Sequence, residues 1–104
     1  LYIPTDNTAA DNAETIANVV IPAGVPVVAG EEGICGGCGV ATLSISYYEI
    51  GHMAGEMAVQ ILKGEKKVSE MAIGFDTTLE KKYNADLCQQ LGLTMPEGYV
   101  PIGG

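Results

Sequence analysis

The chain contains no arginine and no tryptophan, and its 104 residues include a single histidine and a single phenylalanine. Five lysines stand against 13 acidic residues, so the formal net charge is −8 at pH 7. Contacts to nucleic-acid phosphates require a basic patch, and an anionic membrane surface attracts the same kind of patch. The composition therefore argues against nucleic acid and anionic membranes as partners, and the direct consequence of the charge is solubility.

Long apolar runs are also absent, since no stretch approaches the ~18–20 apolar residues of a transmembrane helix. There is no initiator methionine and no signal peptide. The first apolar run, residues 1–3, is shorter than an average strand of ~5–6 residues. We therefore expect the chain to be a fragment that begins inside a strand of a longer protein. Apolar residues make up 47% of it, which is ample for the core of one small domain.

Three short apolar runs, residues 1–3, 25–29 and 40–45, each end abruptly in polar residues. Such runs are typical of buried parallel strands, and residues 9–20 between the first two have helical apolar spacing. The pattern predicts an α/β fold with a parallel sheet in three layers. Ligands bind outside the carboxyl ends of such strands, so the polar residues there should converge on one crevice.

Caps and helix breakers mark the other elements. Thr8 can cap the first helix, and the glycine-rich segment 33–39 is expected to be a flexible loop. Ser46 and Glu49 have capping-box spacing at the start of a long helix. The remaining pattern predicts a helix end at Gly64, a strand over 71–75 and an edge strand over 79–83. It also predicts a short helix that is capped by Asn84, runs through Leu91 and is stopped by Gly92, followed by a Pro/Gly-rich tail over 94–104.

Two groups of polar residues follow the first two predicted strands: Thr5, Asp6 and Asn7, and then Glu31 and Glu32. One residue of the first group must cap the next helix, which leaves the others for a ligand. Of the two glutamates, we expect one to be solvated and the other to pair with a ligand amine or hydroxyl. An alternative is that one glutamate acts as a general base, but no nucleophile motif or orienting histidine accompanies them.

The chain has three cysteines, of which Cys35 and Cys38 form a lone C-x-x-C motif. A zinc site would also need His52 and the distant Cys88, and a redox motif would begin a helix rather than lie in a loop. We expect no metal and no cofactor here, but an incidental thiol pair or a local disulfide. The glycines of this segment fit neither a P-loop nor a dinucleotide-binding fingerprint.

Seven short segments spread over the chain match one known family. They are YIPTDN (2–7), VPVVAGEE (25–32), AT (41–42), YYEIG (47–51), GEMA (55–58), ILKG (61–64) and LGLTMP (91–96). Their order resembles the carboxyl-terminal part of periplasmic-binding-protein type 1 substrate-binding proteins of ABC transporters. Within that group the chain is most similar to the tryptophan/tyrosine-uptake branch.

This resemblance implies two α/β lobes that close on a ligand. Residues 1–45 would supply the sheet of the second lobe, 46–78 a crossing segment and a first-lobe helix, and 79–104 the return to the second lobe and the tail. Thr5, Asp6, Asn7 and Glu31 fall where the family contacts its ligand, and Ser46 and Tyr47 fall at the crossing. The chain departs from the branch at Ser46, where aspartate is frequent, and in its cysteine-containing glycine segment.

The function implied by the resemblance is that of an extracytoplasmic solute-binding component of an ABC importer, periplasmic or lipid-anchored at the outer face of the membrane. Its partners would be the transporter permease and a small ligand, an amino acid, with aromatic ones included. No enzymatic activity is implied. The alternative with the same fold is the ligand-sensing domain of a transcription regulator.

The long helix predicted over 47–62 carries an apolar stripe. Its seven members are Ile50, Met53, Ala54, Met57, Ala58, Ile61 and Leu62. By the resemblance this stripe packs on the first lobe, most of which lies outside the chain. An uncovered stripe of this size favours association, so we expect the isolated chain to form a homodimer or a domain-swapped assembly.

Overall fold

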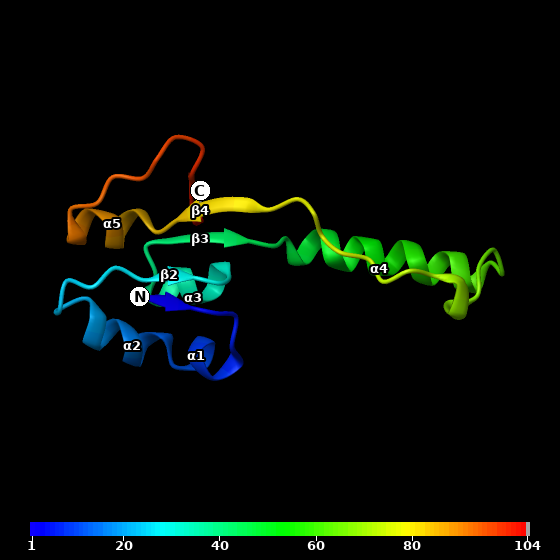
Figure 1. Cartoon of the computed structure of the whole chain (residues 1–104), viewed down its shortest axis with the longest axis horizontal. Coiled ribbons are helices and arrows are strands. Elements are labelled where there is room, and N and C mark those ends of the chain that lie inside the picture. The colour runs from blue at the N-terminus through cyan, green and yellow to red at the C-terminus, as the bar shows by residue number, and fades with distance from the viewer. Residues whose placement is uncertain (104) are drawn as a thin grey trace. The chain divides into compact units, whose positions relative to one another are not determined.

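The structure is a computed structural model that describes residues 1–103 of the chain in two units. Unit 1 comprises Leu1–Ser44 together with the chain from Glu80 onward, and unit 2 comprises Ile45–Leu79. The elements in chain order are β1 (Tyr2–Ile3), α1 (Asn7–Asp11), α2 (Ala13–Val20), β2 (Val28–Ala29), α3 (Glu32–Cys38), β3 (Ala41–Ser44), α4 (Tyr47–Leu62), the 3-10 helix η1 (Val68–Glu70), β4 (Glu80–Tyr83), α5 (Ala85–Leu91) and β5 (Val100–Pro101) (Figure 1). Among residues 1–103, no helix has both the length and the apolar composition that crossing a membrane requires.

Unit 1 is built on a five-stranded sheet with the order β1-β2-β3-β4-β5. The first three strands are parallel neighbours, which confirms the prediction for them. β4 runs antiparallel to β3 with Glu80 opposite Ser44, and β5 is parallel to β4. The chain leaves unit 1 after Ser44 and returns at Glu80, at the same end of the sheet, so β4 must run in the opposite direction. The α/β class is confirmed, whereas the sheet is mixed rather than wholly parallel, and β4 is not an edge strand.

One face of the sheet is covered by α1, α2 and α3. Ala29 lies on that face and is buried in a cluster with Ile34 of α3. Side chains alternate between faces along a strand, so Tyr2, Val28 and Leu43 lie on the opposite face. These three side chains are 65%, 47% and 51% exposed. At these positions the described residues therefore form two of the three predicted layers, the sheet and the helices on one of its faces.

Residues 33–38 of the glycine-rich segment belong to α3 and Gly39 is its C-cap, so the prediction of a flexible loop there is wrong. A Cβ added to Gly37 would lie 2.6 Å from the Cβ of Ala13 on α2. A Cβ added to Gly39 would lie 2.9 Å from the Cα of Cys35. These glycines therefore allow close packing, and glycine in a helix costs only about 0.5–1 kcal/mol relative to alanine.

The first helical segment also differs from its prediction. The carboxylate of Asp6 accepts a hydrogen bond from the Ala9 backbone N–H at 2.8 Å. Asp6 is therefore the cap of α1, which confirms that one residue of the group 5–7 caps this helix, whereas the cap expected at Thr8 is wrong. The single helix predicted over 9–20 is interrupted at Asn12, which ends α1 and precedes α2.

Four other helix ends agree with the local sequence signals. Ser46 caps α4 and Asn84 caps α5 through their side-chain oxygens. Gly64 follows α4 with φ +74°, and Gly92 follows α5 with φ +69°. Both glycines have the left-handed conformation that ends a helix without the steric cost of a Cβ.

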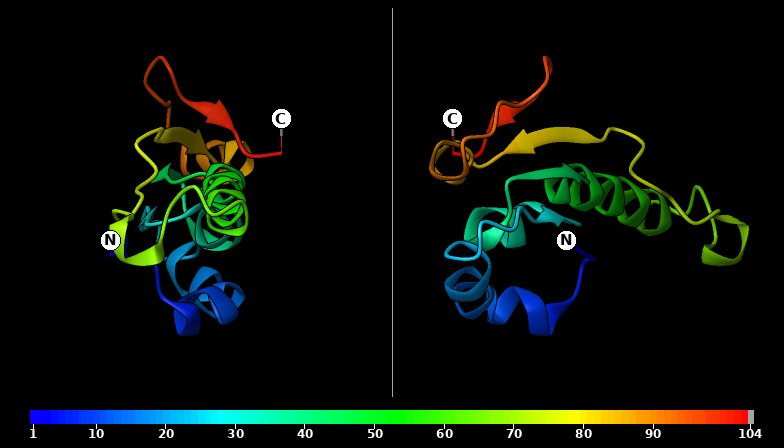
Figure 2. Two further views of the ribbon diagram at one scale, coloured as in Figure 1. Left: turned by 90° about the vertical axis from the view of Figure 1, so that its right-hand side faces the viewer. Right: turned by 60° about the vertical axis from the view of Figure 1, so that its left-hand side comes forward.

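Unit 2 consists of α4 and the segment that runs back along it (Figures 1 and 2). Gly74 of this segment lies against the Met53 side chain of α4. Residues 71–75 form no strand, so the strand predicted there is wrong. No residue of α4 is buried, and its Met53 and Met57 are only half-buried. The tail predicted over 94–104 contains β5, which pairs with β4.

Candidate ligand site at the carboxyl ends of the strands

The turns that follow β1 and β2 lie in contact with each other. The Gly30 N–H donates to the Ile3 carbonyl at 2.8 Å, and a Cβ on Gly30 would lie 2.6 Å from the backbone N of Thr5. Only glycine permits this approach. Asp6 and Glu31 are the next residues along the two turns, so both leave adjacent strands at the same end of the sheet.

Both of these carboxylates also serve as helix caps. Asp6 uses Oδ1 for the Ala9 N–H at the start of α1. Glu31 uses both oxygens, because Oε2 accepts from the Gly33 N–H at 2.8 Å and Oε1 accepts from the Ile34 N–H. Each carboxylate therefore places its negative charge at the positive end of a helix. Thr5 and Asn7 beside them are exposed.

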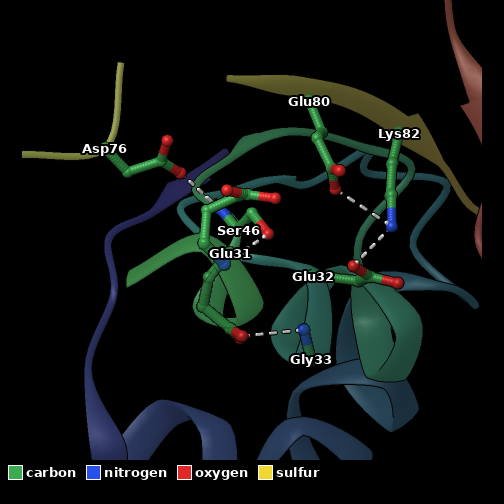
Figure 3. A network of polar contacts seen from close by, with 8 residues as sticks. Glu31, Glu32, Gly33, Ser46, Asp76, Glu80 and Lys82 are labelled. Carbon is green, nitrogen blue, oxygen red and sulfur yellow. Dashed lines mark hydrogen bonds and ion pairs between the residues drawn. The ribbon is translucent and has the colours of Figure 1, made fainter. Parts of the chain in front are cut away.

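Glu32 does not stand free in solvent but takes part in an ion-pair triad (Figure 3). Lys82 Nζ on β4 donates to Glu32 Oε2 at 2.8 Å and lies 3.2 Å from Glu80 Oε2. The hydrogen bond to Glu32, and then that to Glu80, raise the pKa of the Lys82 ammonium. Sequence reasoning missed Glu80 and Lys82, although the alternation over 79–83 places the two on one face of a strand.

Two hydroxyl residues of β3 are buried at this end of the sheet. Thr42 and Ser44 are each 1% exposed. In the antiparallel register Thr42 is paired with Lys82, and Ser44 with Glu80. The Thr42 Oγ1 has no hydrogen-bond partner among the described residues.

In unit 2, Ser46 and Tyr47 begin α4. Ser46 Oγ accepts from the Glu49 N–H at 3.2 Å, and the side chain of Tyr47 is 60% exposed. Asp76 accepts from the Ser46 N–H at 2.8 Å and from the Thr78 N–H at 2.9 Å (Figure 3). Asp76 thus joins the segment that enters unit 2 to the segment that leaves it. No local pattern marked Asp76, because its partner Ser46 lies 30 residues away.

The three cysteines are buried free thiols, so the local disulfide that the sequence left open is not formed. Cys38 Sγ donates to the Ile34 carbonyl and Cys88 Sγ to the Val40 carbonyl, each at 3.5 Å. Among residues 1–103, no cluster of three or more His, Cys, Asp or Glu side chains is arranged to hold a metal ion.

Residues 1–100 match the family model for ABC transporter substrate binding proteins. The chain belongs to this family. A curated relative, the tyrosine-binding protein of Clostridioides difficile (strain R20291), is 33% identical over 81 residues, which is 78% of this chain and 22% of that protein.

Solved structures of similar proteins share the fold of this substrate-binding family member. A ligand-free, open substrate-binding protein with adhesive properties from Clostridium difficile is 32% identical with a TM-score of 0.75, over 97% of this chain and 35% of that one. An ABC domain in complex with L-Trp from Streptococcus pneumonia is 28% identical with a TM-score of 0.79, over 92% and 32% of the two chains. A conserved domain protein from Vibrio cholerae is 25% identical with a TM-score of 0.83, over 96% and 35%. The chain thus spans about a fifth to a third of the length of these relatives.

Proposed function

We propose that this chain is the carboxyl-terminal part of an extracytoplasmic solute-binding protein that delivers an amino acid to the permease of an ABC importer. The family match and the relatives described as tyrosine-binding and as complexed with L-Trp support this function. The structural observation that carries it is the contact between the turns after β1 and β2. It brings polar side chains from two strands to the sheet end where α/β folds bind ligands.

The ligand site includes Thr5, Asp6, Asn7, Glu31 and Glu32 from unit 1. Ser46 and Tyr47 of unit 2 would complete it when the complete protein closes its two lobes on the ligand. In this proposal the second lobe holds 1–45 and 79–104, and 46–78 forms the crossing segment and a first-lobe helix. The acidic groups suit a ligand ammonium, and the exposed Thr5 hydroxyl and Asn7 amide offer uncharged hydrogen bonds.

The complete protein provides the test, in a thermal-shift screen against the amino acids followed by calorimetry. A ligand at 100 times its Kd should stabilise the native state by about 2.7 kcal/mol. Asn7→Ala should weaken binding about tenfold without lowering the melting temperature, because Asn7 begins α1 but is not its cap. Asn18→Ala, at an exposed position of α2, is the matched control and should bind as the wild type does. Absence of stabilisation by every amino acid would contradict the proposal.

A binding role also fits the two glutamates better than general-base catalysis does. Glu31 accepts backbone hydrogen bonds through both oxygens, and Glu32 is paired with Lys82. Both carboxylates are therefore engaged by groups of the protein itself, and neither is a free acceptor for a substrate proton. We therefore expect the ligand to be recovered unchanged from the complex, which mass spectrometry of the bound and released compound will show.

A further inference from the structure

The Glu32–Lys82–Glu80 triad lies at the same end of the sheet as the proposed ligand site. Glu80 is the first residue of β4 and pairs with Ser44, the last residue of β3. Glu32 begins α3 immediately after the turn that follows β2. The triad therefore joins two elements, α3 and β4, where the parallel strands end.

Lys82 has the least exposed side chain of the triad. Its side chain is 25% exposed, against 39% for Glu32 and 41% for Glu80. Two of its three N–H groups are accounted for by the contacts of 2.8 Å and 3.2 Å to these carboxylates. Within residues 1–103 no further acceptor takes the third N–H, so the ammonium can donate one more hydrogen bond to a ligand oxygen.

An independent observation on β3 points to the same place. Thr42 is paired with Lys82 across the two strands, so their side chains lie on the same face of the sheet. The Thr42 Oγ1 is buried and has no partner among the described residues. A buried hydroxyl without a partner is unfavourable, so the face of the sheet that carries Lys82 has an unmet polar group beside it.

The charges of the triad determine which kind of ligand this surface can bind. One ammonium stands between two carboxylates, so the triad has a net charge of −1, and the capping carboxylates of Asp6 and Glu31 lie at the same sheet end. A ligand with only a negative charge is repelled by this surface. A zwitterion offers its ammonium to the carboxylates and its carboxylate to the lysine.

We propose that Lys82 is a specificity-determining residue that receives the carboxylate of an amino-acid ligand, beside Glu32 and Glu80. The inference rests on the proposed function, because it takes the ligand to be an amino acid. It assigns to Lys82 the discrimination between an amino acid and the corresponding amine. A purely structural ion pair that fastens α3 to β4 would affect both ligands equally.

The test compares L-tyrosine with tyramine, which lacks the carboxylate, by calorimetry on the complete protein. Lys82→Met should weaken tyrosine binding by about 10- to 100-fold, the range for a lost hydrogen bond to a charged group, and leave tyramine binding within about threefold. Lys82→Arg keeps the charge and should retain most of the preference for tyrosine. Lys81→Met is the matched control, because Lys81 is the neighbour of Lys82 in β4 but its side chain lies on the other face of the strand and is exposed.

A second measurement needs no variant. Tyrosine at saturation should protect Lys82 from acetylation in the wild-type protein, whereas tyramine at saturation should not, and Lys81 should react equally in both samples. Equal weakening of the two ligands in Lys82→Met, or equal reactivity of Lys82 with both, would overturn the inference while the proposed function stands. If the wild-type protein binds no amino acid at all, the proposed function itself fails.

Discussion

Cys35 shows most clearly how burial changes the chemistry of a single residue in this protein. Burial, followed by the charges of Cys88 and Cys38, raises the pKa of the Cys35 thiol from 9.0 to about 12. Burial also raises the pKa values of Cys38 and Cys88. All three thiols are therefore neutral at physiological pH and weak as nucleophiles. The C-x-x-C pair lies within a helix, contrary to the sequence-based expectation, yet it lacks the low thiol pKa of a redox motif.

These pKa shifts predict a loss of stability at alkaline pH. The native state holds the Cys35 proton more tightly than the unfolded state, whose thiol ionises near its ordinary value of 9.0. The stabilising contribution is fully present below pH 9 and is lost as the pH rises from 9 towards 12, by up to about 1.4 kcal/mol per pH unit. Urea unfolding at several pH values gives the free energy of unfolding as a function of pH. Above pH 9 this free energy should fall less steeply for Cys35→Ala than for the wild type. Identical slopes would contradict the assignment.

At the scale of one element, α3 is the least expected feature of the fold. It contains three glycines, Gly33, Gly36 and Gly37, yet it forms because its buried face packs against α2 and the sheet. Ile34, Cys35 and Cys38 are each at most 2% exposed. Tertiary packing therefore outweighs the low helix propensity of the segment.

Gly36 and Gly37 provide a matched pair of substitutions in this helix. Gly37→Ala should destabilise unit 1 by about 1–3 kcal/mol, because the new Cβ would lie 2.6 Å from Ala13 Cβ and force α2 and α3 apart. Gly36→Ala meets no atom within 4 Å and should stabilise the helix by about 0.5–1 kcal/mol. Chemical denaturation followed by circular dichroism measures both changes. Equal effects of the two substitutions would show that helix propensity, rather than close packing, governs α3.

At the scale of the whole chain, the apolar stripe of α4 is a surface that the described residues leave without a buried member. Ile50 is 38% exposed and Ile61 39% exposed, and the return segment only half-buries Met53 and Met57. In the complete protein we propose that the first lobe covers this stripe. The isolated chain of 104 residues has to cover it in another way.

We therefore expect the isolated chain to associate as a homodimer or by exchange of segments. Ile61→Lys should shift the equilibrium towards the monomer by placing a charge within the stripe, whereas Glu56→Lys, at an exposed position of α4, should have little effect. Sedimentation equilibrium over a range of concentrations will separate these cases. A wild-type chain that stays monomeric at high concentration would contradict the dimer.

The local signals in the sequence determined much of the element list. Ser46 and Asn84 cap α4 and α5 through hydrogen bonds to N–H groups three residues away, so their roles follow from spacing alone. The apolar spacing over 47–62 predicted a helix with the same bounds as α4. The polar residues after β1 and β2 marked the candidate site, because strand ends and turn residues are also local features.

The tertiary structure alone decided the features that depend on distant parts of the chain. The Glu32–Lys82 pair joins residues 50 apart, and the direction of β4 depends on where the chain returns from unit 2. Gly37 acts through Ala13, which is distant in the sequence but adjacent in space. Local spacing specifies hydrogen bonds within a turn of helix, whereas long-range pairs form only once folding has set which surfaces meet. For this reason the sequence alone left open which of Glu31 and Glu32 is solvated and which meets a ligand, and only the fold paired Glu32 with Lys82.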